Sequence, residues 1–120
     1  MIERYSLPRM AGIWSEQFKF KTMLDIEILT LEALAKLKKI PFAAVRRIQK
    51  KAKFNINQIK KIEEKTQHDV VAFVTNVAQN IGPDAKYLHL GLTSSDVLDT
   101  TLGVQLKAAA NMLLEDMEKL

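Results

Sequence analysis

Four consecutive polar side chains, in the order Thr, Ser, Ser and Asp, occupy positions 93–96, after a loop glycine and before an apolar pattern of helical spacing. A helix start attracts anions, because its first backbone N–H groups are unpaired and lie at the positive end of the helix dipole. One side-chain cap is enough, and Ser95 is the expected one, although Leu98 cannot complete a capping box with it. The surplus hydroxyls leave two interpretations open: an over-supplied cap, or a cradle for a carboxylate or phosphate.

The two histidines of the chain are the next candidates. His68 and Asp69 stand at the start of an apolar segment, where the positive end of a helix favours a neutral imidazole that donates one hydrogen bond and accepts another. Asp69 is expected to cap this helix or to fix the tautomer of His68, and a plain capping pair is the alternative. His89 is expected in a loop, and it is a candidate binding residue only because Thr93 follows four residues later.

Basic residues offer two further candidates. Arg4 and Tyr5 near the N-terminus supply a bidentate cation and a hydroxyl for a phosphate or carboxylate, although an exposed tail with a stray arginine is the favoured interpretation of these two residues alone. A basic stretch runs over positions 36–61, with few aromatic residues and with Glu63 and Glu64 after it. This pattern favours a solvated helix face over a nucleic-acid surface.

Composition restricts the class of protein. The chain has 120 residues, of which 48% are apolar and 27% charged, with a net charge of +4, which is typical of one water-soluble domain. The absence of cysteine excludes disulfides, thiolate catalysis and cysteine-based zinc sites, and two histidines make a structural metal site improbable. No signal-peptide core and no apolar run of about 20 residues are present, so the expected location is the cytoplasm, without a membrane partner.

Apolar periodicity predicts an all-α protein. The first long helix is expected to begin after Ser15 and to stop before Pro41, with two apolar faces that indicate packing on more than one side. One face comprises Leu24, Ile28, Leu31 and Ala35, and the other comprises Ile26, Leu29, Ala33 and Leu37. Two short amphipathic helices should follow, the first with the stripe Phe42, Val45 and Ile48, and the second with Ile56, Ile59 and Ile62 and with Asn55 or Asn57 as its cap.

Two further helices complete the expected fold. A nearly buried helix should end at Gly82 and Pro83, since its apolar residues cover most of the circumference: Val70, Val71, Phe73, Val74, Val77, Ala78 and Ile81. A long helix should run from about Ser95 to Leu120, with a bundle seam at Leu98, Leu102, Leu106, Ala109, Leu113, Met117 and Leu120. This seam needs partner helices, which predicts either oligomerisation or a truncated chain.

Three motifs together resemble the adenylosuccinate lyase family, a branch of the fumarase/aspartase superfamily. The motifs are ERYS, EKTQHDVVAFV and HLGLTSSDVLDT, and they occur in the order found in the family. The resemblance implies an N-terminal helical domain over residues 1–92 and the start of a central helical bundle over residues 93–120. It also implies a homotetramer with active sites built from three subunits, no metal or other cofactor, and no nucleic-acid partner.

The resemblance further implies a reaction and a set of site residues. The family eliminates fumarate from adenylosuccinate, leaving AMP, and from the succinyl-carboxamide ribotide of purine biosynthesis, by base-promoted loss of a proton and protonation of the leaving nitrogen. Arg4 and Tyr5 match residues at the phosphate and ribose end, and His89 matches a histidine near the phosphate. Gln67, His68 and Asp69 match a pocket segment in which His68 contacts substrate and is a supporting acid/base candidate. Thr93 and Ser94 match the pair that binds a succinyl carboxylate, which would leave Ser95 and Asp96 to start the helix.

The principal acid and base of the family, a histidine and a serine, would lie beyond Leu120, so the isolated chain is expected to bind without turning over substrate. Two alternatives remain. Argininosuccinate lyase or another relative would not need Arg4 and Tyr5 for a phosphate. A non-catalytic helical interaction module would show stable self-association, or salt-sensitive binding to nucleic acid.

Overall fold

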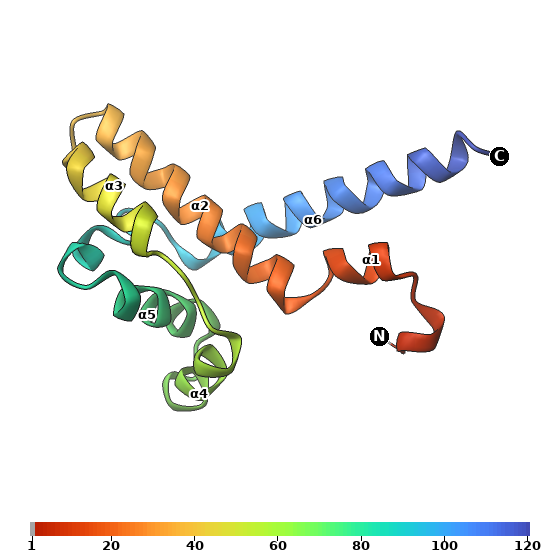
Figure 1. The fold of residues 1–120 in the computed structure, drawn as a ribbon, viewed down its shortest axis with the longest axis horizontal. Coiled ribbons are helices and arrows are strands. Elements are labelled where there is room, and N and C mark those ends of the chain that lie inside the picture. The colour runs from red at the N-terminus through yellow and green to blue at the C-terminus, as the bar shows by residue number, and fades with distance from the viewer. Residues whose placement is uncertain (1) are drawn as a thin grey trace.

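A computed structural model describes residues 2–120. Helices make up the regular structure, and no strand occurs within these residues, as the periodicity predicted. In chain order the elements are η1 (Glu3–Tyr5), α1 (Pro8–Ile13), α2 (Glu16–Lys36), α3 (Phe42–Lys51), α4 (Ile56–Thr66), α5 (Asp69–Ile81), η2 (Pro83–Tyr87) and α6 (Ser94–Met117). Helices α2–α5 form the compact part of the molecule, and α6 extends from it as an arm (Figure 1).

The long helix α2 is the centre of the fold. Its predicted cap is confirmed, because the Ser15 hydroxyl accepts a hydrogen bond from the Phe18 backbone N–H at 3.1 Å. The predicted inner face is also confirmed, with Leu31 and Ala35 each only 1% exposed. Of the second predicted face, Ile26 packs against the core, whereas Leu29 is 61% and Leu37 69% exposed, so this face is only partly buried.

An aromatic cluster joins α2, α5 and the loop before α4. The ring of Phe73, which is fully buried, stacks on Phe20 with 5.7 Å between centroids, and Phe54 lies at a tilt to both rings. The buried amide of Asn76 accepts from the Asn55 backbone N–H at 2.9 Å and so ties the start of α4 to α5. This packing leaves α5 mostly buried, as predicted.

Several details of the smaller helices differ from expectation. Val71 of α5 is 44% exposed, because the N-terminal turn of that helix is open on one side. Phe42 of α3 is also exposed, whereas Val45 and Ile48 of the same predicted stripe are buried. Asn55 rather than Asn57 caps α4.

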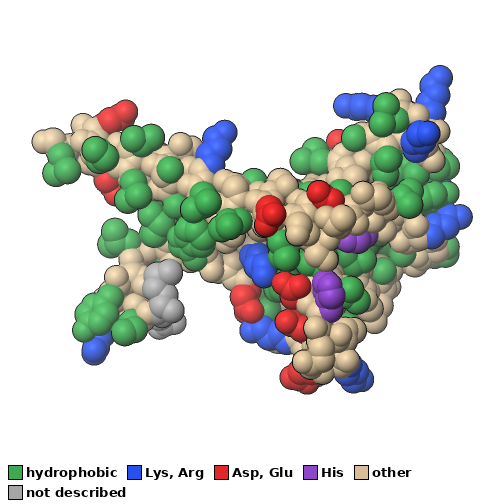
Figure 2. Space-filling view, turned by 180° about the vertical axis from the view of Figure 1, so that it is seen from behind, with side chains coloured by type: hydrophobic (Ala, Val, Ile, Leu, Met, Phe, Trp, Pro, Cys, Tyr) green, Lys and Arg blue, Asp and Glu red, His purple; other side chains and the backbone are tan. Residues whose placement is uncertain are grey.

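The helix α6 departs most clearly from the predicted seam. Its buried positions are spaced by four: Val97, Thr101, Gln105 and Ala109. This face packs on α1 and α2, and the Gln105 amide donates to the Ile13 carbonyl at 2.8 Å. Of the predicted seam, Ala109 is buried and Leu98 partly buried, but Leu102, Leu106, Leu113, Met117 and Leu120 are exposed. Figure 2 shows hydrophobic side chains gathered along this arm. The proposed boundary at residues 92 and 93 stays a prediction.

Candidate functional site

The N-terminus of α6 begins one residue earlier than the helix predicted from Ser95. Thr93 is the cap: its hydroxyl accepts from the Asp96 N–H at 3.3 Å and donates to Asp96 Oδ2 at 2.9 Å. The Asp96 carboxylate in turn accepts from the Thr93 backbone N–H at 2.7 Å, which completes a capping box. These bonds from the Thr93 backbone and hydroxyl lower the pKa of Asp96.

This capping box corrects the prediction of which of the four polar residues caps α6. Ser95 was expected to cap and to lack a reciprocal partner at Leu98, but the box forms between Thr93 and Asp96 instead. The Thr93 hydroxyl is therefore already used twice. The hydroxyls of Ser94 and Ser95 make no hydrogen bond within the described residues, so both remain available to a ligand.

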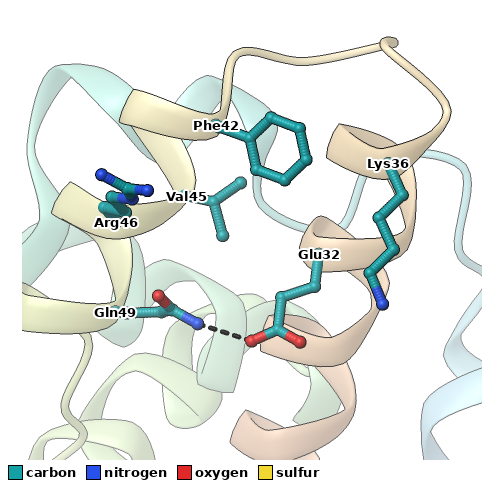
Figure 3. A pocket seen from close by; sticks show the side chains of 6 residues that line it. All are labelled: Glu32, Lys36, Phe42, Val45, Arg46 and Gln49. Carbon is teal, nitrogen blue, oxygen red and sulfur yellow. Dashed lines mark hydrogen bonds between the residues drawn. The ribbon is translucent and has the colours of Figure 1, made fainter.

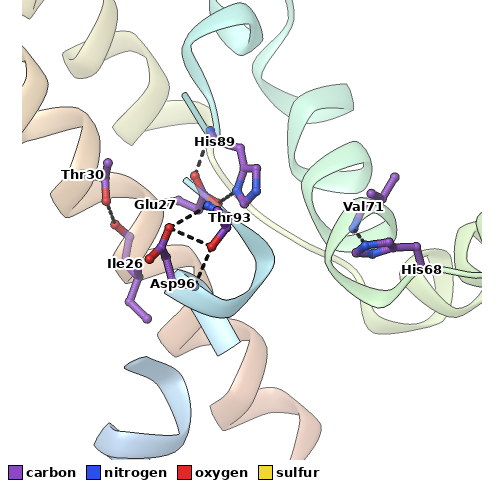
Figure 4. Close-up of polar contacts among 8 residues, drawn as sticks. All are labelled: Ile26, Glu27, Thr30, His68, Val71, His89, Thr93 and Asp96. Atoms are coloured by element: carbon purple, nitrogen blue, oxygen red, sulfur yellow. Dashed lines mark hydrogen bonds and ion pairs between the residues drawn. The ribbon is translucent and has the colours of Figure 1, made fainter. Parts of the chain in front are cut away.

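The loop before α6 is fixed by a buried carboxylate. Glu27 of α2 is 1% exposed, and its Oε2 accepts a hydrogen bond from the His89 backbone N–H at 2.9 Å. Its Oε1 lies 2.6 Å from Nδ1 of the His89 ring. His89 has φ of 61°, a left-handed conformation that is uncommon for a residue with a side chain. Figure 4 shows Glu27 and His89 beside the Thr93–Asp96 capping box.

A small pocket joins this loop to α5. Its volume is about 120 Å³, and it is lined by Val70, Val71, Val74, Thr75, His89 and Ser94. The structure therefore brings together His89 and Ser94, which are two of the residues predicted to bind substrate. The Ser94 hydroxyl at the start of α6 and the His89 imidazole lie at one small recess, and both are groups that can hold an anion.

The second histidine caps α5 itself. Nδ1 of His68 accepts from the Val71 N–H at 3.3 Å, so a neutral His68 carries its proton on Nε2. Asp69, the expected cap, instead accepts from the Val70 N–H and lies 4.0 Å from Lys19 Nζ. His68 lies apart from His89 in Figure 4, but the residue that it caps, Val71, lines the pocket.

The remaining predicted site residues lie outside the pocket. Gln67 ends α4 in a left-handed conformation, and its side chain donates to the Glu64 carbonyl at 2.8 Å. Arg4 and Tyr5 are exposed and stack on each other, with 4.8 Å between the guanidinium carbon and the ring centroid. They belong to η1 near the N-terminus, which lies away from α5 (Figure 1), and neither lines the pocket.

Residues 2–120 contain neither a cluster of metal-binding side chains nor a helix able to span a membrane. Acidic, histidine and cysteine side chains in this range form no group of three or more that could hold a metal ion. None of the described helices has the length and apolarity to cross a membrane.

Glu27 is the residue that sequence reasoning missed. Its signal was present: it lies three residues after Leu24 and four before Leu31, on the face predicted to be buried. A carboxylate at such a position needs a hydrogen-bonding partner, since burying an unpaired charge is costly. The identity of that partner, His89, could not be read from a separation of 62 residues.

Comparison with known proteins defines the class. The sequence matches the family described as Lyase over residues 3–120, and the chain belongs to that family. It is 52% identical over all of its 120 residues to the adenylosuccinate lyase of Synechocystis sp., and 47% identical over 119 residues to that of Bacillus subtilis. The chain spans 28% of the length of each of these relatives.

A solved structure supports the same fold. The crystal structure of a fumarate lyase from Mesorhizobium sp. superposes with a TM-score of 0.74 over 82% of this chain and 24% of that one. The sequence identity is 24%, so this likeness shows the all-α fold alone.

Proposed function

We propose that the complete protein containing this chain is a lyase that eliminates fumarate from adenylosuccinate, and from the succinyl-carboxamide ribotide, in purine nucleotide biosynthesis. The observation that carries the proposal is the 47–52% identity to enzymes named adenylosuccinate lyase, which extends over 98–100% of the chain. The recess between α5 and α6 supports it, because the substrate is polyanionic and this recess offers donors to an anion.

The N-terminus of α6 is proposed to bind a carboxylate of the succinyl group. Ser94 would donate its hydroxyl, and the first backbone N–H groups of α6 would add theirs. Thr93 is kept in the proposal, but its hydroxyl would have to exchange its bond to Asp96 for one to substrate. Since a substrate carboxylate is also repelled by the Asp96 carboxylate, Ser94 is the stronger ligand of the two.

The proposed roles of the histidine segments follow from their free ring nitrogens. His68 uses Nδ1 for its cap and would present Nε2–H to substrate, as a binding donor and a supporting acid/base group. Gln67 and Asp69 would line the pocket on either side of it. His89 would contact the phosphate, with Arg4 and Tyr5 at the phosphate and ribose end.

Arg4 and Tyr5 do not line the pocket of their own chain, which supports a site shared between subunits. In a homotetramer, these residues of one chain could complete the pocket of another, and the exposed apolar face of α6 offers the surface for such an assembly. We therefore include a cytoplasmic homotetramer in the proposal. The products would be fumarate and AMP, and no cofactor is invoked.

The elimination itself needs one base and one acid. The base removes a proton from the succinyl carbon next to a carboxylate, the C–N bond breaks as the C=C bond of fumarate forms, and the acid protonates the departing nitrogen. The resemblance assigns the principal pair to residues outside these 120. The 120-residue chain alone is therefore expected to release no fumarate.

The test is a substrate comparison with the purified complete gene product. Fumarate release should occur with adenylosuccinate and not with argininosuccinate, and a Ser94→Ala variant should raise KM while Ser95→Ala leaves it unchanged. Release from argininosuccinate alone would overturn the proposed substrate in favour of another lyase. Release from neither compound would overturn the enzyme assignment.

A further inference from the structure

The contact between Glu27 and His89 stands out because it uses every polar atom of a buried side chain. Both carboxylate oxygens of Glu27 are occupied by one residue, the backbone N–H of His89 on Oε2 and the ring Nδ1 on Oε1. A carboxylate that is 1% exposed is retained in a core only when such partners compensate its lost hydration. The pair joins the middle of α2 to the loop that enters α6.

The loop needs this anchor because of its backbone. His89 has φ of 61° and Gly91 has φ of 77°, and only the second residue is of a type that adopts this region freely. A left-handed conformation at a residue with a side chain persists when the surroundings enforce it. The hydrogen bond that the His89 backbone N–H donates to Glu27 supplies that constraint.

The same carboxylate selects the tautomer of the ring. An ionised Glu27 can only accept hydrogen bonds, so the Nδ1 atom 2.6 Å from it must carry a proton. Nε2 is then the ring nitrogen left to accept from a ligand, and within the described residues it makes no hydrogen bond. The His89 side chain is 24% exposed and lines the pocket that also contains Ser94.

We infer that Glu27 is a positioning residue, which locks His89 in one orientation and in the Nδ1–H tautomer so that Nε2 is presented to the ligand of this pocket. That Nε2 meets a ligand rests on the proposed function, whereas the assignment of the His89 tautomer does not. His68 has the opposite arrangement, since its Nδ1 is an acceptor and its proton belongs on Nε2. The two histidines of the chain are therefore expected to be opposite tautomers, and His68 serves as an internal reference for His89.

The first experiment reads the tautomers directly by 15N NMR of imidazole-labelled chain without ligand, at about pH 9, where imidazole is neutral. A His68→Gln variant assigns the signals of the two histidines. We expect His89 to be protonated on Nδ1 and His68 on Nε2. If His89 in the unsubstituted chain carries its proton on Nε2, the inference is overturned, whether or not any variant folds.

The isosteric substitution Glu27→Gln tests whether the Glu27 carboxylate determines the tautomer of His89. In Glu27→Gln, the amide oxygen can still accept from the His89 backbone N–H while the amide NH₂ faces Nδ1, so His89 should switch to the Nε2–H tautomer. Glu32→Gln is the matched control, because Glu32 lies on the same helix but accepts from Gln49 in a recess between α2 and α3 (Figure 3). It should leave both tautomers unchanged. A folded Glu27→Gln chain without a switch contradicts the inference.

Kinetics of the complete gene product separate the inference from the proposed function. Glu27→Gln should lower kcat/KM by about tenfold to a hundredfold, the usual cost of losing a group that orients a binding side chain, and Glu32→Gln should not. A tautomer switch with unchanged kcat/KM would uphold the link between Glu27 and His89 and overturn the role given to His89 in the proposed function.

Discussion

Replacing the three hydroxyl residues at the start of α6 one at a time should give three different results. Thr93→Ala removes a cap, and the measured cost of such a loss is typically about 1 kcal/mol. We expect a loss of no more than about 1 kcal/mol here, within the known span of about 0.5–2 kcal/mol for helix caps. The Thr93 hydroxyl accepts from the Asp96 N–H at a long 3.3 Å, and the 2.7 Å hydrogen bond from the Thr93 backbone N–H to the Asp96 carboxylate survives the change. Ser95→Ala should alter the free energy of unfolding by less than about 0.5 kcal/mol, because Ser95 is exposed.

The assay is thermal unfolding of the chain followed by circular dichroism. An unfolding entropy of about 2.1 cal/mol/K per residue corresponds to roughly 0.25 kcal/mol/K for a chain of this length, so Thr93→Ala should lower Tm by about 4 °C. Ser94→Ala should leave Tm nearly unchanged and instead raise KM in the complete gene product. A larger loss of Tm for Ser95→Ala than for Thr93→Ala would refute the assignment of the cap.

Three further outcomes are expected. Phe73→Ala, which empties the centre of the aromatic cluster, should lower the free energy of unfolding by about 3–5 kcal/mol in urea titrations, and a loss under about 1 kcal/mol would contradict the packing of α5. The hydrogen bond from Arg47 lowers the pKa of Asp84, so stability from this pair should be present at neutral pH and be lost as the pH falls through that lowered value. In Asp84→Asn, the urea midpoint of unfolding should therefore fall less steeply as the pH is lowered. An unchanged pH dependence would show that the Arg47–Asp84 pair contributes no stability. Replacing Leu106 and Leu113 by lysine should reduce self-association in sedimentation velocity, since both are more than half exposed, and unchanged association would place the interface elsewhere.

Local signals in the sequence predicted the helices well. Ser15 caps the first long helix, and Gly82 with Pro83 ends α5, because caps and breakers act within a few residues of the chain. The first long helix ends at Lys36, before Pro41, which instead occupies the N-cap position of α3. The cap of α6 was misplaced by two residues, at Ser95 instead of Thr93. With Ser95 as cap, the residue three positions on is Leu98, whereas from Thr93 it is Asp96, which completes the box.

Contacts between distant segments were beyond such reasoning. Periodicity indicated that α6 has an apolar seam, but the face that packs on α1 and α2 carries Thr101 and Gln105, because Gln105 bonds to the Ile13 carbonyl. The pairing of Glu27 with His89 likewise depends on how α2 meets the loop before α6. Periodicity identifies which residues can be buried, whereas the partner of a buried polar group follows only from the tertiary arrangement.

The central claim, that the start of α6 binds the succinyl end of the substrate, is tested most directly by product inhibition of the complete gene product. Fumarate carries the succinyl carboxylates and AMP carries the phosphate, so the two products report on opposite ends of one site. Ser94→Ala should raise the inhibition constant of fumarate by about tenfold or more, the value of a hydrogen bond to a charged group, and leave that of AMP unchanged. Weaker inhibition by AMP with unchanged inhibition by fumarate would place Ser94 at the phosphate end and contradict the account.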